Sequence, residues 1–233
     1  MGSTRLPGKV LHSIAGEPLL SRLCKRLRGC RTVATVIVAT SNLPQDEVVA
    51  QACRGWGGLV FRGAETDVLS RFLGAAQQYK LDTVVRVTAD NPLTDPQGID
   101  ALVEAYRASG APLVHNSHRR GYPYGTGAEL VRVAALEACD RRSLKAEERE
   151  HLTSYLRRHP EEFSCVKVEA PPELLRPDYF LTVDYPQDAI LLERIYERFN
   201  RRNDMELCEV IAYLDANPDL VAINAGLHQG FEQ

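Results

Sequence analysis

Two periods of apolar residues alternate along the first half of the chain. Short runs rich in β-branched residues, such as DTVVRVTAD at 82–90, are typical of buried strands, whereas longer stretches place apolar residues on one face of a helix. The predicted strands cover 32–41, 58–63, 82–90 and 111–117, and the predicted helices cover 17–28, 45–57, 65–80 and 96–109. This alternation predicts βαβ units and a largely parallel sheet covered by helices on both faces.

The pattern is less regular after residue 117. The predicted elements there are a helix over 147–163, a strand over 163–170, a strand that runs into a turn over 179–188, and helices over 189–201 and 207–218. No repeat, low-complexity segment or linker-like stretch interrupts the chain. We therefore expect one domain over residues 1–233, with an inserted or appended subregion at about 118–180 that binds an acceptor or forms a dimer contact.

Composition narrows the class of protein. A hydrophobic content of 44% and a charged content of 25% are ordinary for a globular protein. The net charge of −3 gives no reason to expect nucleic acid or an anionic membrane as a partner. No apolar run reaches the roughly 18 residues that a membrane span needs, and no secretory signal pattern opens the chain. Six scattered cysteines without a Cys-x-x-Cys pair predict reduced, mostly buried thiols in a cytoplasmic protein.

The first eleven residues, MGSTRLPGKVL, have neither a helical nor a strand period. Small residues, hydroxyls and two cations in one loop could wrap an anion, because backbone N–H groups approach closely at glycine and the cations supply charge. The candidate anion-binding residues are Gly2, Ser3, Thr4, Arg5, Gly8 and Lys9. A flexible, solvated N-terminus is the alternative, and this stretch alone does not decide between the two.

Two predicted strands end in the same way. Asp90 closes the strongest strand and is followed by Asn91 and a proline, and Asp184 closes the later strand two residues ahead of Pro186. Ligands of an open α/β sheet bind at the carboxyl ends of its strands, and two carboxylates there could share one Mg²⁺. For either aspartate alone, a turn-forming role is the alternative.

A third polar cluster combines YPYGTGAEL at 122–130 with EREHLT at 148–153. The glycine-rich, aromatic first segment suits a substrate loop, with Glu129 as its functional carboxylate. His151 could act as an acid, a base or a hydrogen-bond donor, although a single histidine on a helix is more often structural. The GTG sequence lacks the spacing of a dinucleotide-binding motif.

Several motifs together resemble a known family. They are GSTRLPGKVL, FRGAETDVLSRF (61–72), ADNPLTDP (89–96), YPYGTGAE (122–129), EREHLT, LTVDYPQD (181–188) and NPDLVAIN (217–224). In content and order they resemble the cytidylyltransferases that make CMP-activated sugar acids, such as 3-deoxy-manno-octulosonate cytidylyltransferase. The resemblance is closer still to the branch named after spore-coat polysaccharide biosynthesis.

This resemblance implies a three-layer α/β/α sandwich around a mainly parallel mixed sheet, like that of nucleotide-diphospho-sugar transferases. It implies transfer of CMP from CTP to a small anionic acceptor, with release of pyrophosphate, and often a homodimer. Mg²⁺ would be held by Asp90 and Asp184. The implied catalytic and nucleotide-binding residues are Gly2, Ser3, Thr4, Arg5, Lys9 and Asn91, and the implied acceptor-binding residues are Tyr124, Gly125, Glu129, Glu150 and His151.

The chain departs from this family at one point. Relatives carry an apolar first strand that ends in Ala-Arg just ahead of the residue matching Met1, and this sequence has neither. A sheet without that strand would expose two unpaired edges. Either the sequence starts late or the protein is shortened and inactive, and the intact later motifs favour the first explanation.

Two other functions remain open at this point. A glycosyltransferase that uses a finished nucleotide sugar could share the fold, although its usual Asp-x-Asp motif is missing. A non-catalytic nucleotide-binding protein is the expected result if the first strand is truly absent.

Overall fold

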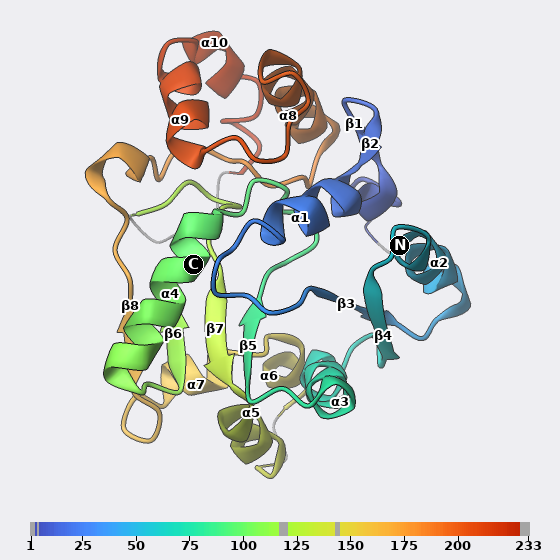
Figure 1. Ribbon diagram of the computed structural model, residues 1–233, viewed down its shortest axis with the longest axis vertical. Helices are drawn as coiled ribbons and strands as arrows, with labels where there is room; N and C mark the ends of the chain where they lie inside the picture. Colours follow the sequence, from blue (N-terminus) through green and yellow to red (C-terminus); the bar gives the residue numbers. More distant parts are fainter. Residues whose placement is uncertain (1–2, 4, 117–120, 143–144, 229–233) are drawn as a thin grey trace.

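A four-stranded mixed sheet forms the centre of the computed structural model, which describes residues 3, 5–116, 121–142 and 145–228 (Figure 1). Its order is β5 (Thr83–Arg86), β7 (Glu129–Arg132), β6 (Leu113–His115) and β8 (Cys165–Lys167). β7 is antiparallel to both β5 and β6, whereas β8 is parallel to β6. The 118–180 stretch therefore supplies two of the four strands of this sheet.

Helices cover both faces of the sheet because apolar residues occupy consecutive positions in β6 and β7. Leu113 pairs with Val131, and both belong to one core cluster with residues of α3 (Val68–Tyr79), α5 (Val133–Asp140) and α7 (Ser154–Arg158). Val114 pairs with Leu130, and both belong to another cluster with residues of α4 (Pro96–Ser109). Successive side chains of a strand point to opposite faces. The result is the predicted three-layer α/β/α sandwich.

A second, two-stranded ladder lies beside this sheet. β3 (Ile37–Ser41) and β4 (Leu59–Gly63) are parallel and are connected through α2 (Glu47–Gly55). Figure 1 shows them to one side of β5. Within the described residues, no ladder joins β3 to β5.

The helix α1 (Leu19–Leu27) connects distant parts of the chain through two buried arginines. Arg22 donates to the carbonyl oxygens of Ile14 and Ala15, in and just after the hairpin strand β1 (Ser13–Ile14), which pairs with β2 (Glu17–Pro18). Arg26 donates to the carbonyl oxygens of Thr94 at 2.8 Å and Met205 at 2.6 Å. The two guanidinium groups donate hydrogen bonds to backbone carbonyl oxygens that lie outside regular secondary-structure pairing. They therefore hold α1 to the N-terminal hairpin, to the loop after β5 and to the C-terminal segment.

The C-terminal helices gather at one end of the molecule, at the top of Figure 1. They are α8 (Pro186–Arg198), α9 (Leu207–Asp215) and α10 (Pro218–Val221). Their core includes Leu181 and Val183 from the segment ahead of α8. This end of the fold therefore holds the backbone that leads to Asp184.

The remaining elements are short. They are α6 (Ala146–Glu150) and the 3₁₀ turns η1 (Lys9–Leu11), η2 (Pro44–Asp46) and η3 (Pro172–Leu174). The helix predicted over 147–163 is wrong as one element, because the chain turns at His151–Thr153 and buries Leu152 before α7 begins. The strand predicted over 179–188 is also wrong, since only an isolated bridge between Tyr124 and Phe180 forms there and Pro186 opens α8.

Two predictions from composition can be checked here. All six cysteines are free, and four of them are buried, namely Cys24, Cys30, Cys53 and Cys139. None of the helices in the described ranges has the length and apolar content required to cross a membrane.

Candidate active site

The ammonium group of Lys9 lies between the two aspartates that close the predicted strands. Its Nζ atom is 2.6 Å from Oδ2 of Asp90 and 2.8 Å from Oδ1 of Asp184. Lys9 thus contacts two residues that follow it by 81 and 175 positions in the chain. The structure therefore brings the N-terminal loop, Asp90 and Asp184 together.

Backbone hydrogen bonds hold the two acidic positions side by side. Asp90 lies four residues beyond the end of β5, and its carbonyl oxygen accepts a hydrogen bond from the N–H of Val183 at 2.9 Å. The hydroxyl of Thr182 donates to the same oxygen at 3.4 Å. The convergence of the carboxylates is thus built into the main chain and does not depend on side-chain rotamers alone.

The N-terminal loop places a second cation on this site. Nη2 of Arg5 is 2.8 Å from Oδ1 of Asp184, and the guanidinium lies 4.9 Å from the ring centre of Tyr185. Ser3 accepts a hydrogen bond from the N–H of Leu6 at 3.3 Å, which folds the loop back on itself. The predicted ligands Gly2 and Thr4 lie outside the described residues.

Charge and burial in the site are uneven. The side chain of Asp184 is 7% exposed and that of Lys9 15%, whereas Asp90 is 24% and Arg5 40% exposed. Burial alone would lower the pKa of Lys9, but the negative charges of Asp90 and Asp184 outweigh it and raise the pKa. Lys9 therefore stays cationic at neutral pH, and the site is open on the side of Asp90 and Arg5.

Asp188 holds the backbone of Asp184 and Tyr185 in place through hydrogen bonds. Its Oδ2 atom accepts the N–H groups of Asp184 and Tyr185, both at 2.8 Å, and its Oδ1 atom accepts from Asn224 at 2.7 Å and pairs with Nε2 of His228 at 2.9 Å. Burial alone would raise the pKa of this fully buried carboxyl, but the hydrogen bonds, first from His228, lower it.

The sequence analysis did not identify this role of Asp188. The N-cap is Tyr185, and Asp188 lies in the first turn of α8, four residues after Asp184. That spacing was a usable signal, because residues four apart at a helix start lie close together. No nearby residue pattern in the sequence indicated that Asn224 and His228 contact Asp188.

Tyr124 and Gly125 lie close to the acidic pair. Burial raises the pKa of Tyr124, and the negative charges of Asp184 and Asp90 raise it further. The N–H of Leu181 donates to the carbonyl of Tyr124 at 2.7 Å, so this loop runs beside the segment that leads to Asp184. Gly125 has a φ of +89°, and a Cβ there would meet the backbone N of Thr182 at 2.6 Å. Glycine is therefore required by both conformation and space.

Asn91 is turned toward Thr88, within the turn that follows β5. Its Nδ2 atom donates to the hydroxyl of Thr88 at 2.7 Å, and its backbone N–H donates to the carbonyl of the same residue. The Oδ1 atom is buried and has no partner within the described residues. Asn91 therefore shapes the turn that presents Asp90.

Glu129 belongs to a separate ionic cluster. Its carboxylate pairs with Arg86 at 2.9 Å and with Arg157, and it accepts a hydrogen bond from Thr153 at 3.0 Å. Burial alone would raise the pKa of Glu129, but the two guanidinium groups lower it. Arg86 faces Glu129 in the β5–β7 register, so the cluster lies at the end of β5, four residues ahead of Asp90 in the chain.

The other two predicted acceptor residues lie on the surface near this cluster. Glu150 is the last residue of α6, and His151 follows it as the C-cap, and both are exposed. The structure therefore does not bring Glu129, Glu150 and His151 to the Asp90–Asp184 pair.

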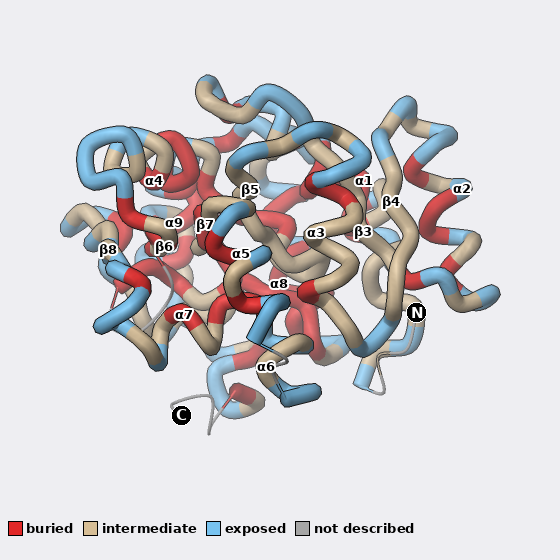
Figure 2. The backbone as a smooth tube through the Cα atoms, turned by 90° about the horizontal axis from the view of Figure 1, so that it is seen from below, coloured by how far each residue is buried: buried red, intermediate tan, exposed pale blue. Residues whose placement is uncertain are grey.

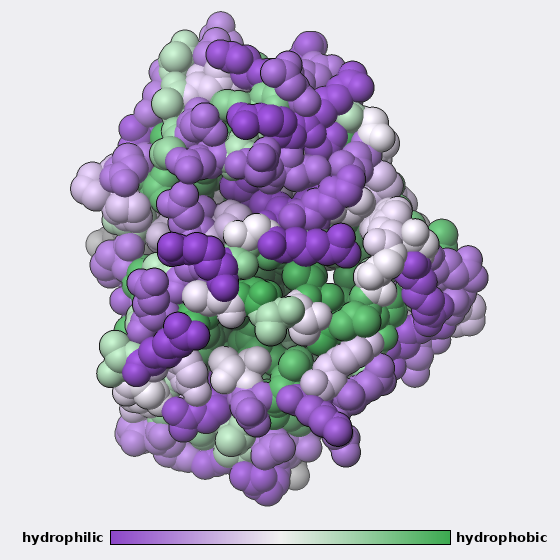
Figure 3. Space-filling view, in the orientation of Figure 1, coloured by the Kyte–Doolittle hydropathy of each residue, from purple (hydrophilic) through white to green (hydrophobic). Residues whose placement is uncertain are grey.

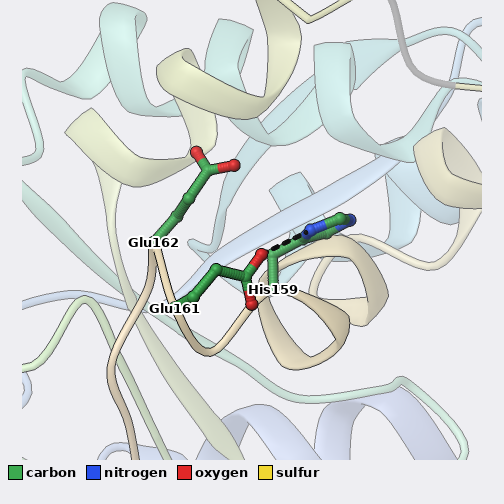
Figure 4. Close-up of side chains that lie close together, drawn as sticks. All are labelled: His159, Glu161 and Glu162. Carbon is green, nitrogen blue, oxygen red and sulfur yellow. Dashed lines mark hydrogen bonds and ion pairs between the residues drawn. The ribbon is translucent and has the colours of Figure 1, made fainter.

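A group of possible metal ligands follows α7 (Figure 4). His159 and Glu161 form an ion pair at 3.0 Å, while Glu162 pairs with Arg142. The ring of His159 also stacks on Tyr155 at 4.1 Å. The glutamates are exposed and the partners on hand already account for these groups, so we assign this cluster to the surface.

Hard oxygen ligands and flanking cations define what the main site could bind. Two carboxylates close enough to share one ammonium group can equally face one small divalent cation, and Mg²⁺ takes one or two protein carboxylates with the rest from water and phosphate. Arg5 and Lys9 supply charge for an anion beside it. The donor set fits Mg²⁺ held by Asp90 and Asp184.

An α/β/α fold that brings the carboxylates of Asp90 and Asp184 together is the architecture of a nucleotidyltransferase. A solved structure of a cytidylyltransferase from Leptospira borgpetersenii matches it with a TM-score of 0.88 and 29% identity, over 95% of this chain and 92% of that one. A structure of CMP:2-keto-3-deoxy-manno-octonic acid synthetase complexed with CTP shares the fold, with a TM-score of 0.61 and 18% identity over 85% and 95% of the two chains.

The sequence profile of the cytidylyltransferases matches residues 1–213, and the chain belongs to this family. It is 33% identical to the spore coat polysaccharide biosynthesis protein SpsF of Bacillus subtilis over 94% of this chain and 92% of that protein. It is also 38% identical over 117 residues to the 3-deoxy-manno-octulosonate cytidylyltransferase of Geobacter sulfurreducens, which covers 49% of this chain and 42% of the relative. The resemblance inferred from the motifs is thereby confirmed.

Proposed function

We propose that this protein transfers CMP from CTP to a small anionic acceptor, a sugar acid, a phosphonate or a phosphorylated metabolite, and releases pyrophosphate. The observation that carries this proposal is the ammonium group of Lys9 between the carboxylates of Asp90 and Asp184, with Arg5 beside it. The family supports the use of CTP, and the names of its relatives in polysaccharide biosynthesis support a sugar-derived acceptor.

The reaction needs charge neutralisation more than covalent chemistry. An acceptor oxygen forms a bond to the α-phosphorus while the bond to the bridging oxygen breaks, so negative charge accumulates on the departing pyrophosphate. Arg5 and Lys9 stand where they could bind triphosphate oxygens and offset that charge. Their shared contact with Asp184 fixes their positions before nucleotide binds.

Asp90 and Asp184 would hold Mg²⁺, which supplies Lewis-acid polarisation of the phosphates when bound. Without nucleotide, Lys9 neutralises the two carboxylates. When nucleotide binds, we expect Lys9 to move its contact from these carboxylates to a phosphate. The direct test of the metal role is to measure Mn²⁺ binding to the native protein and to Asp184→Asn. Binding is detected through the effect of Mn²⁺ on water-proton relaxation.

The acceptor is proposed to lie on the side of Tyr124 and Gly125. This loop borders the acidic pair, whereas the cluster of Glu129, Arg86 and Arg157 lies farther along β5 and β7. An elongated acceptor would extend from the Tyr124–Gly125 loop to the cluster around Glu129, with Glu150 and His151 at its far end. Acceptors of graded length, compared by KM, test this arrangement.

The activity itself is tested by pyrophosphate release with each NTP, Mg²⁺ and a panel of anionic acceptors. We expect turnover with CTP, a fall in kcat of about 100-fold or more in Asp90→Asn and Asp184→Asn, and little change in melting temperature. Asp82→Asn, an exposed change directly ahead of β5, is the matched control and should retain activity. CTP binding without turnover for any acceptor would instead indicate a nucleotide-binding protein.

A further inference from the structure

The turn that carries Asp90 lies outside regular secondary structure. It belongs to the segment 87–95, which connects β5 to α4 and contains no helix or strand. Within it, the N–H of Asn91 donates to the carbonyl of Thr88, and the N–H of Thr94 donates to the carbonyl of Asn91, both at 3.1 Å. These short-range bonds shape the turn but do not place it in the molecule. The position of Asp90 therefore depends on contacts from other parts of the chain.

A buried tyrosine of α8 makes one of these contacts. The hydroxyl of Tyr196 donates to the carbonyl oxygen of Pro92 at 3.1 Å. Proline has no backbone N–H, so this carbonyl is the only main-chain group at position 92 that can form a hydrogen bond. Burial raises the pKa of Tyr196 to about 12, and the phenol therefore keeps the proton that it donates. The bond fixes the turn two residues after Asp90.

The turn is also packed against α8 through one apolar side chain. Leu93 is fully buried and belongs to the same core cluster as Leu192 and Tyr196. Figure 2 shows the buried backbone around α8, and Figure 3 shows a mainly hydrophilic surface over this end of the molecule. The apolar residues of α8 thus face inward, where the turn packs on them.

The ring of Tyr196 is held in place by a cation of α1. The guanidinium of Arg22 lies 4.0 Å from the centre of this ring, and both side chains are almost completely buried. Arg26, one helical turn later, donates to the carbonyl oxygen of Thr94 at 2.8 Å. α1 therefore orients the tyrosine and supports the same turn at its far end.

α8 contacts both halves of the acidic pair. Asp188, in its first turn, accepts a hydrogen bond from the N–H of Asp184 at 2.8 Å. Tyr196 follows eight residues later, about 12 Å along the helix axis, and holds the turn of Asp90. The backbone bond from Val183 to Asp90 at 2.9 Å closes the arrangement. One helix therefore sets the positions of the two acidic segments relative to each other.

We propose that Tyr196 is a positioning residue for the acidic pair: by holding the carbonyl of Pro92, its hydroxyl sets the separation of the Asp90 and Asp184 carboxylates and so the affinity of the site for a divalent cation. This inference rests on the metal role of the two aspartates in the proposed function. Mg²⁺ accepts little departure from octahedral geometry, so ligands on separate loops need a preset spacing. Without the bond to Tyr196, the turn would sample other positions and the two carboxylates would converge less often.

The first test measures amide hydrogen exchange in the metal-free protein. Tyr196→Phe removes one oxygen atom and leaves the ring in the core. We expect exchange at Val183, whose N–H is bonded to the turn, to become about tenfold faster. Exchange at Asp184 and Tyr185 should stay as in the native chain, because the first turn of α8 still accepts their N–H groups. A general loss of stability would instead speed exchange at all three residues alike.

The second test measures binding of Mn²⁺ alone, detected through water-proton relaxation. We expect the Kd for Mn²⁺ to rise about tenfold in Tyr196→Phe, as for other residues that orient metal ligands. With CTP and an acceptor, kcat should fall while KM for CTP changes little, because Arg5 and Lys9 are untouched. Tyr213→Phe, on α9, is the matched control. Its hydroxyl has no hydrogen bond with any described residue, and this variant should behave as the native chain in every measurement.

Unchanged exchange at Val183 in Tyr196→Phe, or faster exchange there with unchanged Mn²⁺ affinity, would overturn the proposal. So would a Tyr196→Phe chain that does not fold, because the hydroxyl would then be a requirement of the whole core. Failure of the native chain to bind Mn²⁺ would overturn both this inference and the proposed metal role. Mn²⁺ binding without any turnover of CTP would contradict the proposed function alone, and the two variants would still decide the role of Tyr196.

Discussion

The carboxylate of Asp188 accepts a hydrogen bond from the backbone N–H of Asp184 at 2.8 Å. Through this bond and the one from Tyr185, a fully buried acid determines the direction in which Asp184 points. Asn224 and His228 hold the other oxygen of Asp188. A residue without access to nucleotide can therefore affect the chemistry at Asp184.

Replacing Asp188 should affect stability and turnover together. Asp188→Ala removes four hydrogen bonds and leaves buried donors unpaired, so we expect the free energy of unfolding to fall by about 3–5 kcal/mol in urea titrations. In the fraction that stays folded, kcat should fall while KM for CTP changes little. Asp219→Asn, an exposed change on α10, is the control. Normal kcat in folded Asp188→Ala would show that the acid is only structural.

Lys9 should matter more for nucleotide binding than for folding. Lys9→Met leaves Asp90 and Asp184 without their shared cation and removes one phosphate ligand, so we expect CTP affinity to fall about 100-fold in calorimetry. Lys9→Arg should recover part of this loss because the charge is kept. Lys80→Met, on an exposed helix end, should bind CTP as the native chain does. Unchanged affinity in Lys9→Met would remove the lysine from the proposed triphosphate site.

Gly125 is predicted to be intolerant of any side chain. A Cβ at this position would meet the backbone N of Thr182 at 2.6 Å, and the φ of +89° disfavours L-residues. We expect Gly125→Ala to lower the free energy of unfolding by roughly 2 kcal/mol or more and to displace the segment ahead of Asp184. Gly55→Ala has open space around its Cβ and should be neutral. Equal melting temperatures for the two variants would contradict the close approach.

Acid should destabilise the protein partly through His115. Burial, together with the positive charge of Arg157, lowers the pKa of His115 to about 4 from an ordinary value of 6.5. Between these values the unfolded chain binds a proton that the folded chain does not, so stability falls as pH decreases from 6.5 toward 4. Denaturant titrations between pH 4.5 and 7.5 should show a flatter profile for His115→Gln, with the difference from the native chain below about pH 6.5. His12→Gln, an exposed control, should retain the native profile.

The strongly periodic elements could be predicted from the sequence. The apolar stripe over 65–80 and the proline-led stretch over 96–109 became α3 and α4, with Asp67 and Asp95 as the N-caps. The two Asp-x-Pro motifs at Asp90 and Asp184 were also visible before the fold was known, although no regular strand leads to Asp184. These signals are local, and local signals survive when tertiary packing agrees with them.

β7 could not be found in this way. Its four residues, Glu129–Arg132, begin and end with charged side chains, and a short half-polar run gives no strand period. The strand forms because β5 and β6 flank it and because Arg86 and Arg157 neutralise Glu129. The partners of Asp188 were missed for a similar reason, since Asn224 and His228 lie 36 and 40 residues away along the chain.

The distant support of Asp184 bears on how this protein should be handled. The ring of His228 stacks on Phe180 and pairs with Asp188, which in turn holds the backbone of Asp184. An affinity tag that folds back onto this ring, or onto Arg5 and Lys9, would disturb the site. Purified material should therefore carry a cleavable tag on a long spacer, and its activity should be compared before and after cleavage.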